Sequence, residues 1–416
     1  MEFQGECEGL TEAGGFFCAA VASDVRGKRD GRLDLGILHS KRPFTSAGVF
    51  TTNDVKAAPV RYCMDLLSRK DHAHALVVNS GNANACTGEQ GERDAQVMAS
   101  ETARQLNLDK DDVFVCSTGR IGEKMPISRI TMGIKDAAED LADGIEGGRA
   151  FLRAILTSDT RTKSCVAEVK TKSGVYRVAG AAKGAGMIEP DMATMLAFLT
   201  TDAEVDASVL RPLLKEVVDE TFNKVTVDGD MSTNDTVLAF ANGFSRVKVN
   251  SRSQSEIQSL RDAMVKVCQY LAEKIVGDGE RITKVVKVTV EGASDDVSAE
   301  RVARAIANSL LVKTSWYGCD PNWGRLVDAA GYAKAGLAFE RLDLFYEDVP
   351  ALRQGEPQTR HREKWNEIVS RDRFSIRMNL NQGEGACSVL STDLTEGYVD
   401  FNKSEAPTNP NSSSES

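Results

Sequence analysis

Residues Lys183–Phe198 read KGAGMIEPDMATMLAF and form the most unusual stretch of this 416-residue chain. The stretch opens with a glycine-rich bend and closes in an apolar run, which predicts a buried strand over Met195–Thr200. Apolar runs of the same kind predict strands at Ala75–Asn79, which leads into a loop over Ser80–Cys86, and at Val113–Cys116. Helical spacing predicts helices over Glu89–Leu106, Ser128–Asp143, Glu146–Leu156, Ser208–Val225, Ile257–Val276 and Ser298–Ser309.

Shorter patterns complete the expected secondary structure. They predict strands at Ser164–Lys170, Val175–Ala179, Val285–Val290, Phe374–Leu380, Cys387–Leu390 and Val399–Phe401. Residues Leu344–Asp372 are charged and irregular, which predicts a surface excursion, and the polar tail from Ser404 to Ser416 is expected to be disordered. Together these patterns predict an α+β fold in which helices pack on mixed sheets.

Length and charge limit the class of protein. A chain of 416 residues is long enough for two or three domains. With 51 Lys and Arg against 61 Asp and Glu, the net charge is −10, which argues against a general nucleic-acid binder. No run of 18 apolar residues is present, so no membrane span is expected. The first 20 residues contain four Glu and no basic residue, which shows no targeting signal and favours a cytoplasmic location.

Metal and disulfide chemistry have little support. The nine cysteines are widely spaced without a CxxC motif, which indicates a reducing compartment and mostly buried thiols. Only four histidines are present, so few residues are available to form a zinc site or a Ser-His-Asp triad. Residues Asp228–Asp235 begin like a calcium loop but have Thr233 and Ala239 where that loop needs Gly and Glu. We therefore expect no metal site.

The junction Ala193-Thr194 offers one route to catalysis without histidine. A threonine hydroxyl is a poor nucleophile unless a base takes its proton. If the backbone is cut before Thr194, the freed α-amine, with an ordinary pKa near 8, can act as that base. An N→O acyl shift at the small Ala193, followed by hydrolysis, would make this cut. By itself, however, such a dipeptide is far more often an ordinary part of a strand.

Other sequence segments along the chain favour the catalytic interpretation of this junction. Taken together and in order, they resemble the ornithine acetyltransferase/glutamate N-acetyltransferase (ArgJ) family over nearly the whole chain. The resemblance implies an ArgJ-like fold with two lobes and the active site between them. The matching blocks are Gly48–Asn53 with Val55–Pro59, Asn79–Asn84, Ser117–Gly122, Lys183–Phe198, Thr226–Asp230 with Ser232–Asp235, Gly277–Glu280 and Asp320–Arg325.

The resemblance also implies roles for single residues. Thr194 would be the autoprocessing residue and the acetyl-accepting nucleophile, and Thr118 and Gly119 would hold the oxyanion. One such donor typically lowers the barrier by about 3 kcal/mol. Lys183 carries a charge suited to a substrate carboxylate, and Glu280 one suited to an ammonium group. The implied substrate-binding residues are Thr157, Lys183, Thr194, Glu280 and Asn402.

The implied reaction transfers acetyl from N-acetylornithine to glutamate without metal or organic cofactor, in arginine biosynthesis. Some members of the family also use acetyl-CoA as donor. The cut would leave an α chain of residues 1–193 and a β chain of residues 194–416, and the family implies a dimer of this two-chain unit.

Two departures from the family pattern leave alternatives open. Arg281-Ile-Thr-Lys284 stands where the family usually has Gly-Ala-Thr-Lys, so Arg281 is expected to pair with Glu280 or to narrow the pocket. Pro407 stands where the family has a Ser or Thr contact. The alternatives are an amidohydrolase or aminopeptidase with an N-terminal nucleophile, and an unprocessed homologue without catalysis.

Overall fold

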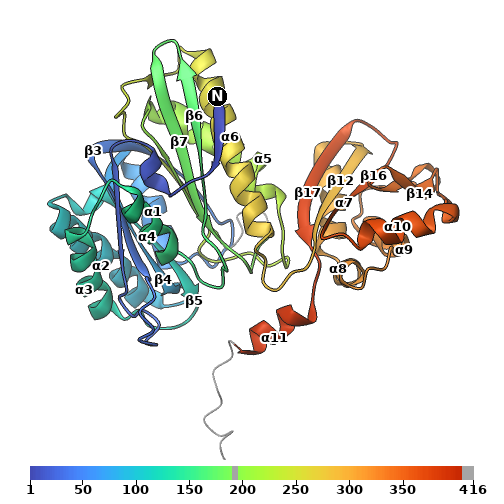
Figure 1. The fold of residues 1–416 in the computed structure, drawn as a ribbon, viewed down its shortest axis with the longest axis horizontal. Coiled ribbons are helices and arrows are strands. Elements are labelled where there is room, and N and C mark those ends of the chain that lie inside the picture. The colour runs from blue at the N-terminus through green and yellow to red at the C-terminus, as the bar shows by residue number, and fades with distance from the viewer. Residues whose placement is uncertain (190–194, 405–416) are drawn as a thin grey trace, which may run out of the picture. The chain divides into compact units, whose positions relative to one another are not determined.

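The computed structural model describes residues 1–189 and 195–404, which form two compact units (Figure 1). Unit 1 comprises residues 1–225 and 229–275, and unit 2 comprises residues 226–228 and the chain from Val276 onward. Each unit combines a mixed sheet with helices, which confirms the expected α+β class. The compact units divide the chain near residues 225 and 275, so they differ from the expected cleavage fragments.

Unit 1 is built, within the described residues, on a nine-stranded sheet with the order β1-β6-β7-β8-β10-β3-β4-β5, and β2 also pairs with β3. The pairs β8–β10 and β4–β5 are parallel, whereas the other pairs are antiparallel. The strands are β1 (Glu2–Glu6), β2 (Phe16–Val21), β3 (Leu35–Phe50), β4 (His72–Asn82), β5 (Val113–Arg120), β6 (Lys163–Thr171), β7 (Gly174–Lys183), β8 (Leu196–Thr201) and β10 (Thr236–Ala241). A separate pair joins β9 (Glu204–Val205) to β11 (Lys248–Val249).

Helices cover both faces of the β3–β5 region. Leu76 and Val78 belong to a core with α1 and α4, while Val77 between them belongs to a second core with α2 and α3. Because successive strand residues point to opposite faces, a strand buried on both sides is apolar throughout. This explains the unbroken apolar run that predicted β4. The helices of unit 1 are α1 (Ala58–Arg69), α2 (Gly88–Leu106), α3 (Ile127–Glu139), α4 (Ile145–Ala154), α5 (Ala207–Glu220) and α6 (Gln254–Val276).

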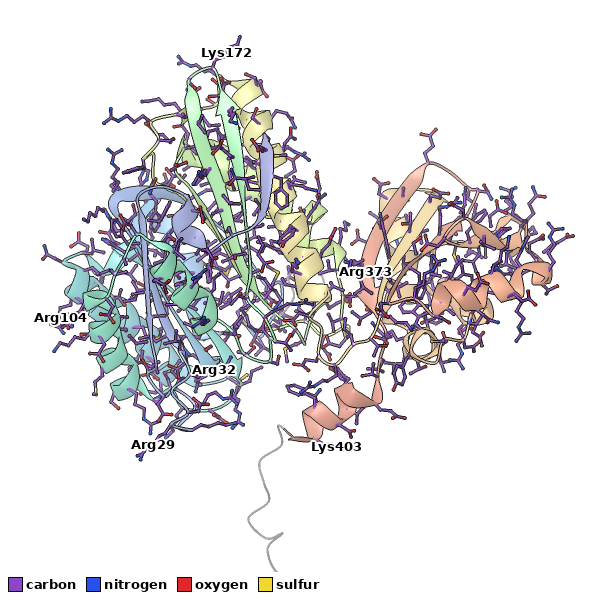
Figure 2. The ribbon with its side chains drawn as sticks, viewed as in Figure 1. Arg29, Arg32, Arg104, Lys172, Arg373 and Lys403 are labelled. Atoms are coloured by element: carbon purple, nitrogen blue, oxygen red, sulfur yellow. The ribbon has the colours of Figure 1, made fainter. Side chains whose placement is uncertain are left out.

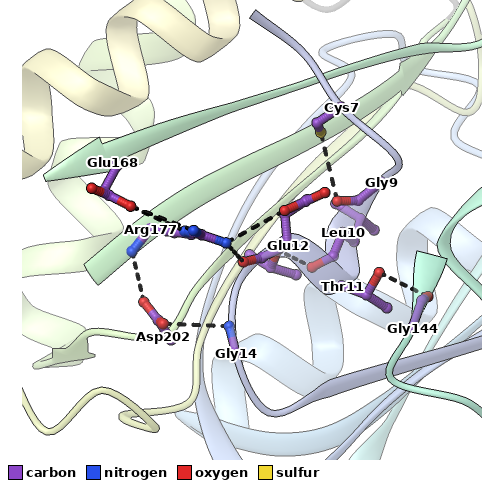
Figure 3. Close-up of polar contacts among 11 residues, drawn as sticks. Cys7, Gly9, Leu10, Thr11, Glu12, Gly14, Gly144, Glu168, Arg177 and Asp202 are labelled. Carbon is purple, nitrogen blue, oxygen red and sulfur yellow. Dashed lines mark hydrogen bonds and ion pairs between the residues drawn. The ribbon is translucent and has the colours of Figure 1, made fainter. Parts of the chain in front are cut away.

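Figure 3 shows how the N-terminal segment is attached to this sheet. The Arg177 guanidinium on β7 lies 3.4 Å from Glu168 Oε2 and 3.5 Å from Glu12 Oε2. Asp202, directly after β8, accepts the backbone N–H groups of Arg177 at 2.7 Å and Gly14 at 3.3 Å. Asp202 therefore joins three separate parts of the chain at the end of β8.

Unit 2 contains, in its described part, a six-stranded sheet with the order β15-β14-β13-β16-β12-β17. Its core includes Trp316, Tyr346 and Trp365. The strands are β12 (Val285–Ala293), β13 (Asp343–Tyr346), β14 (Val349–Arg353), β15 (Glu356–Pro357), β16 (Arg373–Asn379) and β17 (Gly385–Thr392). The helices are α7 (Asp296–Asn308), α8 (Leu310–Tyr317), α9 (Trp323–Tyr332), α10 (Arg362–Val369) and α11 (Glu396–Ser404).

Two predicted features of unit 2 are wrong. Residues Leu344–Asp372 are not an irregular excursion, because they form most of β13 together with β14, β15 and α10, and they bury Tyr346 and Trp365. Their strands are short and separated by charged turns, so their apolar residues show no clear period. The expected strand Val399–Phe401 lies inside α11, since a three-residue apolar run cannot distinguish the periods of strand and helix.

The cysteines agree with the prediction of mostly buried thiols. All nine are free; six are buried, Cys7 is partly buried, and Cys86 and Cys319 are exposed. None of the described helices is long and apolar enough to cross a membrane.

Candidate active site

The start of β8 lies between β7 and β10. Leu196 is paired with Lys183 of β7 on one side and with Thr236 of β10 on the other. The residue before it, Met195, donates its N–H to Asp235 Oδ1 at 2.9 Å and accepts the N–H of Thr236 at 3.1 Å. Ala193 and Thr194 lie outside the described residues. The described chain resumes at Met195, whose two backbone polar groups are both bound.

Asn234 connects this point to β5. Its side-chain Nδ2 donates to the carbonyl of Ser117 at 2.9 Å and to the carbonyl of Ala83 at 2.6 Å. The Ser117 hydroxyl in turn donates to Asn79 Oδ1 at 2.6 Å. Asn234 and Asp235 are neighbours, so one short segment ties the residue before Thr118 to the residue after Thr194. Four of the separate sequence blocks therefore meet here.

Thr118 and Gly119 lie within β5 rather than in a turn after it. The apolar run predicted that this strand ends at Cys116, but β4 continues to Asn82, and Ser80 and Gly81 pair with Thr118 and Gly119. Thr118 is buried, and its hydroxyl makes no hydrogen bond among the described residues. The hydroxyl is thus available to another acceptor, as an oxyanion donor must be.

Gly119 has no room for a side chain. Its φ is +134°, and a Cβ atom there would lie 2.3 Å from the backbone carbon of Gly81. For Gly119→Ala we expect the β4–β5 pairing to be disrupted, with a loss of stability and of any activity that depends on Thr118. Denaturant unfolding measures this loss.

Gly122→Ala is the matched control, because Gly122 also has a positive φ, +82°, but nothing lies within 4 Å of its Cβ position. If the two variants lost equal stability, contact with the Gly81 backbone would not be the cause, and the positive φ alone would explain the loss.

Lys183 and Thr157 are in direct contact within unit 1. Lys183 Nζ donates to Thr157 Oγ1 at 2.6 Å and lies 3.7 Å from Asp159 Oδ2. Asp159 Oδ1 also accepts Lys163 Nζ at 2.6 Å and the N–H of Gly184 at 2.7 Å. The side chains of Asp159 and Lys163 are fully buried and that of Lys183 is 2% exposed. The common expectation of a solvated loop lysine therefore does not hold for Lys183.

The charges of this cluster decide the state of Asp159. Burial by itself raises the pKa of the Asp159 carboxyl, but the ammonium groups of Lys183 and Lys163 outweigh burial, so the pKa is well below its ordinary value. Asp159 is therefore an anion that holds two lysines. Arg32, labelled in Figure 2, also donates to the carbonyl of Thr157 at 3.0 Å. The arrangement holds Thr157 next to Lys183 as a polar pair.

Four residues of this site were not predicted from the sequence. Asp159 and Lys163 lie close to Thr157 in the chain, but a single Asp and Lys carry no recognisable pattern. Asn234 and Asp235 stood inside a recognised block, yet nothing in the block indicated their partners. Those partners lie 117 and 40 residues away in the chain, at Ser117 and Met195.

Unit 2 brings its two predicted site residues together. Asn402 Nδ2 on α11 donates to Glu280 Oε2 at 3.4 Å and to the carbonyl of Tyr398 at 2.9 Å. The Arg281 guanidinium is exposed and lies 5.4 Å from the ring centre of Phe401, and it forms no ion pair with Glu280 in the described part of the chain. The expected pairing of Arg281 with Glu280 is therefore absent. The contact expected at Pro407 lies outside the described residues.

No group of three or more His, Cys, Asp or Glu side chains within residues 1–189 and 195–404 has the arrangement of a metal site.

The profile of the ArgJ family matches residues 17–404. The chain belongs to the ArgJ family. The arginine biosynthesis bifunctional protein ArgJ of Thermotoga neapolitana is 44% identical over 393 residues, 93% of this chain and 98% of that protein. The protein of the same name from Symbiobacterium thermophilum is 41% identical over 400 residues, 95% and 98% of the two chains. Membership places the chain among acyltransferases of arginine biosynthesis.

Two solved structures are also similar. The ArgJ protein of Bacillus halodurans is 37% identical, covers 50% of this chain and 98% of its own, and has a TM-score of 0.48. An ornithine acetyltransferase of Mycobacterium tuberculosis, crystallised with ornithine, is 35% identical, covers 45% of this chain and 98% of its own, and has a TM-score of 0.42.

Proposed function

We propose that this chain cuts itself between Ala193 and Thr194 and then transfers acetyl from N-acetylornithine to glutamate. One observation carries the proposal in this ArgJ-family chain: Asn234 and Asp235 bind Ser117 and Met195, the neighbours in sequence of Thr118 and Thr194. One segment thereby binds the residue before the proposed oxyanion donor and the residue after the proposed nucleophile.

The proposed cut proceeds in two steps. Thr194 Oγ attacks the carbonyl carbon of Ala193, the peptide bond breaks, and an ester forms between the two residues. Water then hydrolyses this ester, which leaves a carboxylate on Ala193 and a free α-amine on Thr194. The products are chains of residues 1–193 and 194–416.

The proposed transfer uses the new α-amine as base. It accepts the Thr194 Oγ proton while Oγ attacks the acetyl carbon of N-acetylornithine. The acetyl–nitrogen bond breaks, and the α-amine returns the proton to the leaving nitrogen of ornithine. The glutamate amine then attacks the acetyl ester, its proton passes back to Oγ, and N-acetylglutamate leaves.

The proposed binding groups match the charges of these substrates. Lys183, held by Thr157 and Asp159, offers a fixed ammonium group for a substrate carboxylate. Glu280, held by Asn402, offers a carboxylate for an ammonium group. Acetyl-CoA as a second donor and a dimer of the two-chain unit remain predictions from the family.

The test is incubation of the purified chain with acetyl-labelled N-acetylornithine and glutamate, followed by mass spectrometry of products and protein. We expect label in N-acetylglutamate and, before glutamate is added, an acetyl adduct on the fragment that begins at Thr194. Label found only in free acetate would favour a hydrolase, and a single uncut chain without adduct would favour a homologue without catalysis.

Thr118→Ala is expected to slow both cleavage and transfer by about 10²-fold or more, because one oxyanion donor is lost. Time courses of cleavage and single-turnover acetylation measure this effect. Thr200→Ala is the matched control, since Thr200 is a buried hydroxyl of the same sheet that donates to the Leu10 carbonyl at 2.8 Å. Equal rates in Thr118→Ala and the unmodified chain would remove Thr118 from the mechanism.

A further inference from the structure

Asp235 occupies an unusual position immediately before β10. The residue is fully buried, and its Oδ1 accepts the N–H of Met195 at 2.9 Å. The next residue, Thr236, donates its N–H to the Met195 carbonyl at 3.1 Å. The consecutive residues Asp235 and Thr236 therefore hold both backbone polar groups of Met195, the residue before β8.

The burial of the second carboxyl oxygen of Asp235 is not explained by a structural contact within the described part of the chain. Oδ2 is buried and has no hydrogen-bond partner among the described residues. Burial raises the pKa of Asp235 well above its usual range, and interactions with Met195, Lys183, Ser232 and Thr51 lower it only in part. Buried polar groups are normally paired, so a carboxyl group kept here at a cost in stability calls for a functional reason.

We propose that Asp235 is a positioning residue for both cleavage and acetyl transfer, and that it acts by holding the backbone of Met195. The inference rests on the proposed function, because Met195 follows the proposed nucleophile in the sequence. Asn234, the residue before Asp235, is bound to Ser117, which precedes Thr118. The segment 234–235 therefore connects Ser117 to Met195, and in the proposed reaction a displacement of about 1 Å can cost about 10²-fold in rate.

The same unit offers a matched control in Asp202. This carboxyl is also buried, has a pKa raised by burial, and accepts two backbone N–H groups, from Arg177 and Gly14 (Figure 3). It lies directly after β8, at the opposite end of the strand from Met195. Loss of Asp202 tests the general cost of removing a buried carboxyl that binds backbone.

The experiment compares full-length Asp235→Ala, Asp235→Asn and Asp202→Ala chains with the unmodified chain after cell-free translation. The rate of cleavage is followed on denaturing gels, and thermal unfolding reports stability. We expect Asp235→Ala to cleave at least about 10²-fold more slowly. We expect Asp235→Asn to stay within about tenfold, because its amide oxygen still accepts the Met195 N–H, and Asp202→Ala to cleave at the unmodified rate.

The outcomes separate the two proposals. An unmodified chain that stays uncut overturns the proposed function, and the inference with it. An unmodified chain that cuts while Asp235→Ala cuts equally fast overturns the inference alone. If Asp202→Ala or Asp235→Asn cuts as slowly as Asp235→Ala, the inference is also overturned.

A kinetic measurement on cleaved Asp235→Asn distinguishes positioning from substrate binding. We expect kcat to fall by no more than about tenfold, with the KM values for N-acetylornithine and glutamate within about twofold of the unmodified enzyme. A raised KM with unchanged kcat would overturn the inference, because Asp235 would then act through Lys183 on substrate binding.

Discussion

Thr194→Ala should leave one uncut chain of 416 residues that takes up no acetyl group. Without Oγ there is no atom to attack the Ala193 carbonyl, so neither the acyl shift nor the acetyl ester can form. Removal of a catalytic nucleophile typically lowers kcat by about 10⁶-fold. Intact-mass spectrometry before and after N-acetylornithine reads both effects at once.

Thr194→Ser is the control, because it keeps a hydroxyl at the same position. We expect it to yield two fragments, of 193 and 416 − 193 = 223 residues, and to accept acetyl. Two fragments from Thr194→Ala would mean that the cut lies elsewhere or is made by another protein, and the assigned nucleophile would be wrong.

Asp159→Asn should have the largest effect on stability. The carboxylate lies between Lys163 and Lys183, so its loss leaves two buried ammonium groups without this anion. Removing one partner of a buried ion pair typically costs about 3–5 kcal/mol. We expect a fall of that size in the free energy of unfolding, measured with denaturant, and a raised KM because Lys183 and Thr157 lose their support.

Asp65→Asn is a suitable control, because Asp65 is 64% exposed and pairs with Arg69 at 2.9 Å on the surface. Exposed pairs contribute little, so its stability should hardly change. Similar losses in both variants would show that the Asp159 cluster is no more important than a surface pair.

The stability difference between the unmodified chain and Asp159→Asn should also depend on pH. The pKa of Asp159 is lowered in the folded state, so above the ordinary aspartate value near 4 its contribution is complete. As pH falls below about 4, the unfolded chain binds a proton that the folded chain does not, and the difference shrinks. Urea unfolding at pH 7 and near pH 3 tests this, and a difference that grows in acid would contradict the assignment.

Two long helices of unit 1 follow closely from local spacing, whereas β1, β2, β3, α1 and β10 were not predicted. The predicted helices Glu89–Leu106 and Ile257–Val276 differ from α2 and α6 by one and three residues at their starts. Their apolar residues recur over many turns, so the period is clear. Unit 2 was harder to predict, because β13 and β14 are only four and five residues long and no period can be recognised in so few residues.

The sequence by itself determined the class of fold and the family blocks, and it predicts a threonine nucleophile, because these depend on residue types at short spacing. Only the tertiary structure decided which polar groups act together. Asn234 meets Ser117 across 117 residues of chain, and Asp159 is an anion only because two lysines from neighbouring strands surround it in a buried site. Hydrogen bonds and charge interactions act through a few ångströms of space, whatever the separation along the chain.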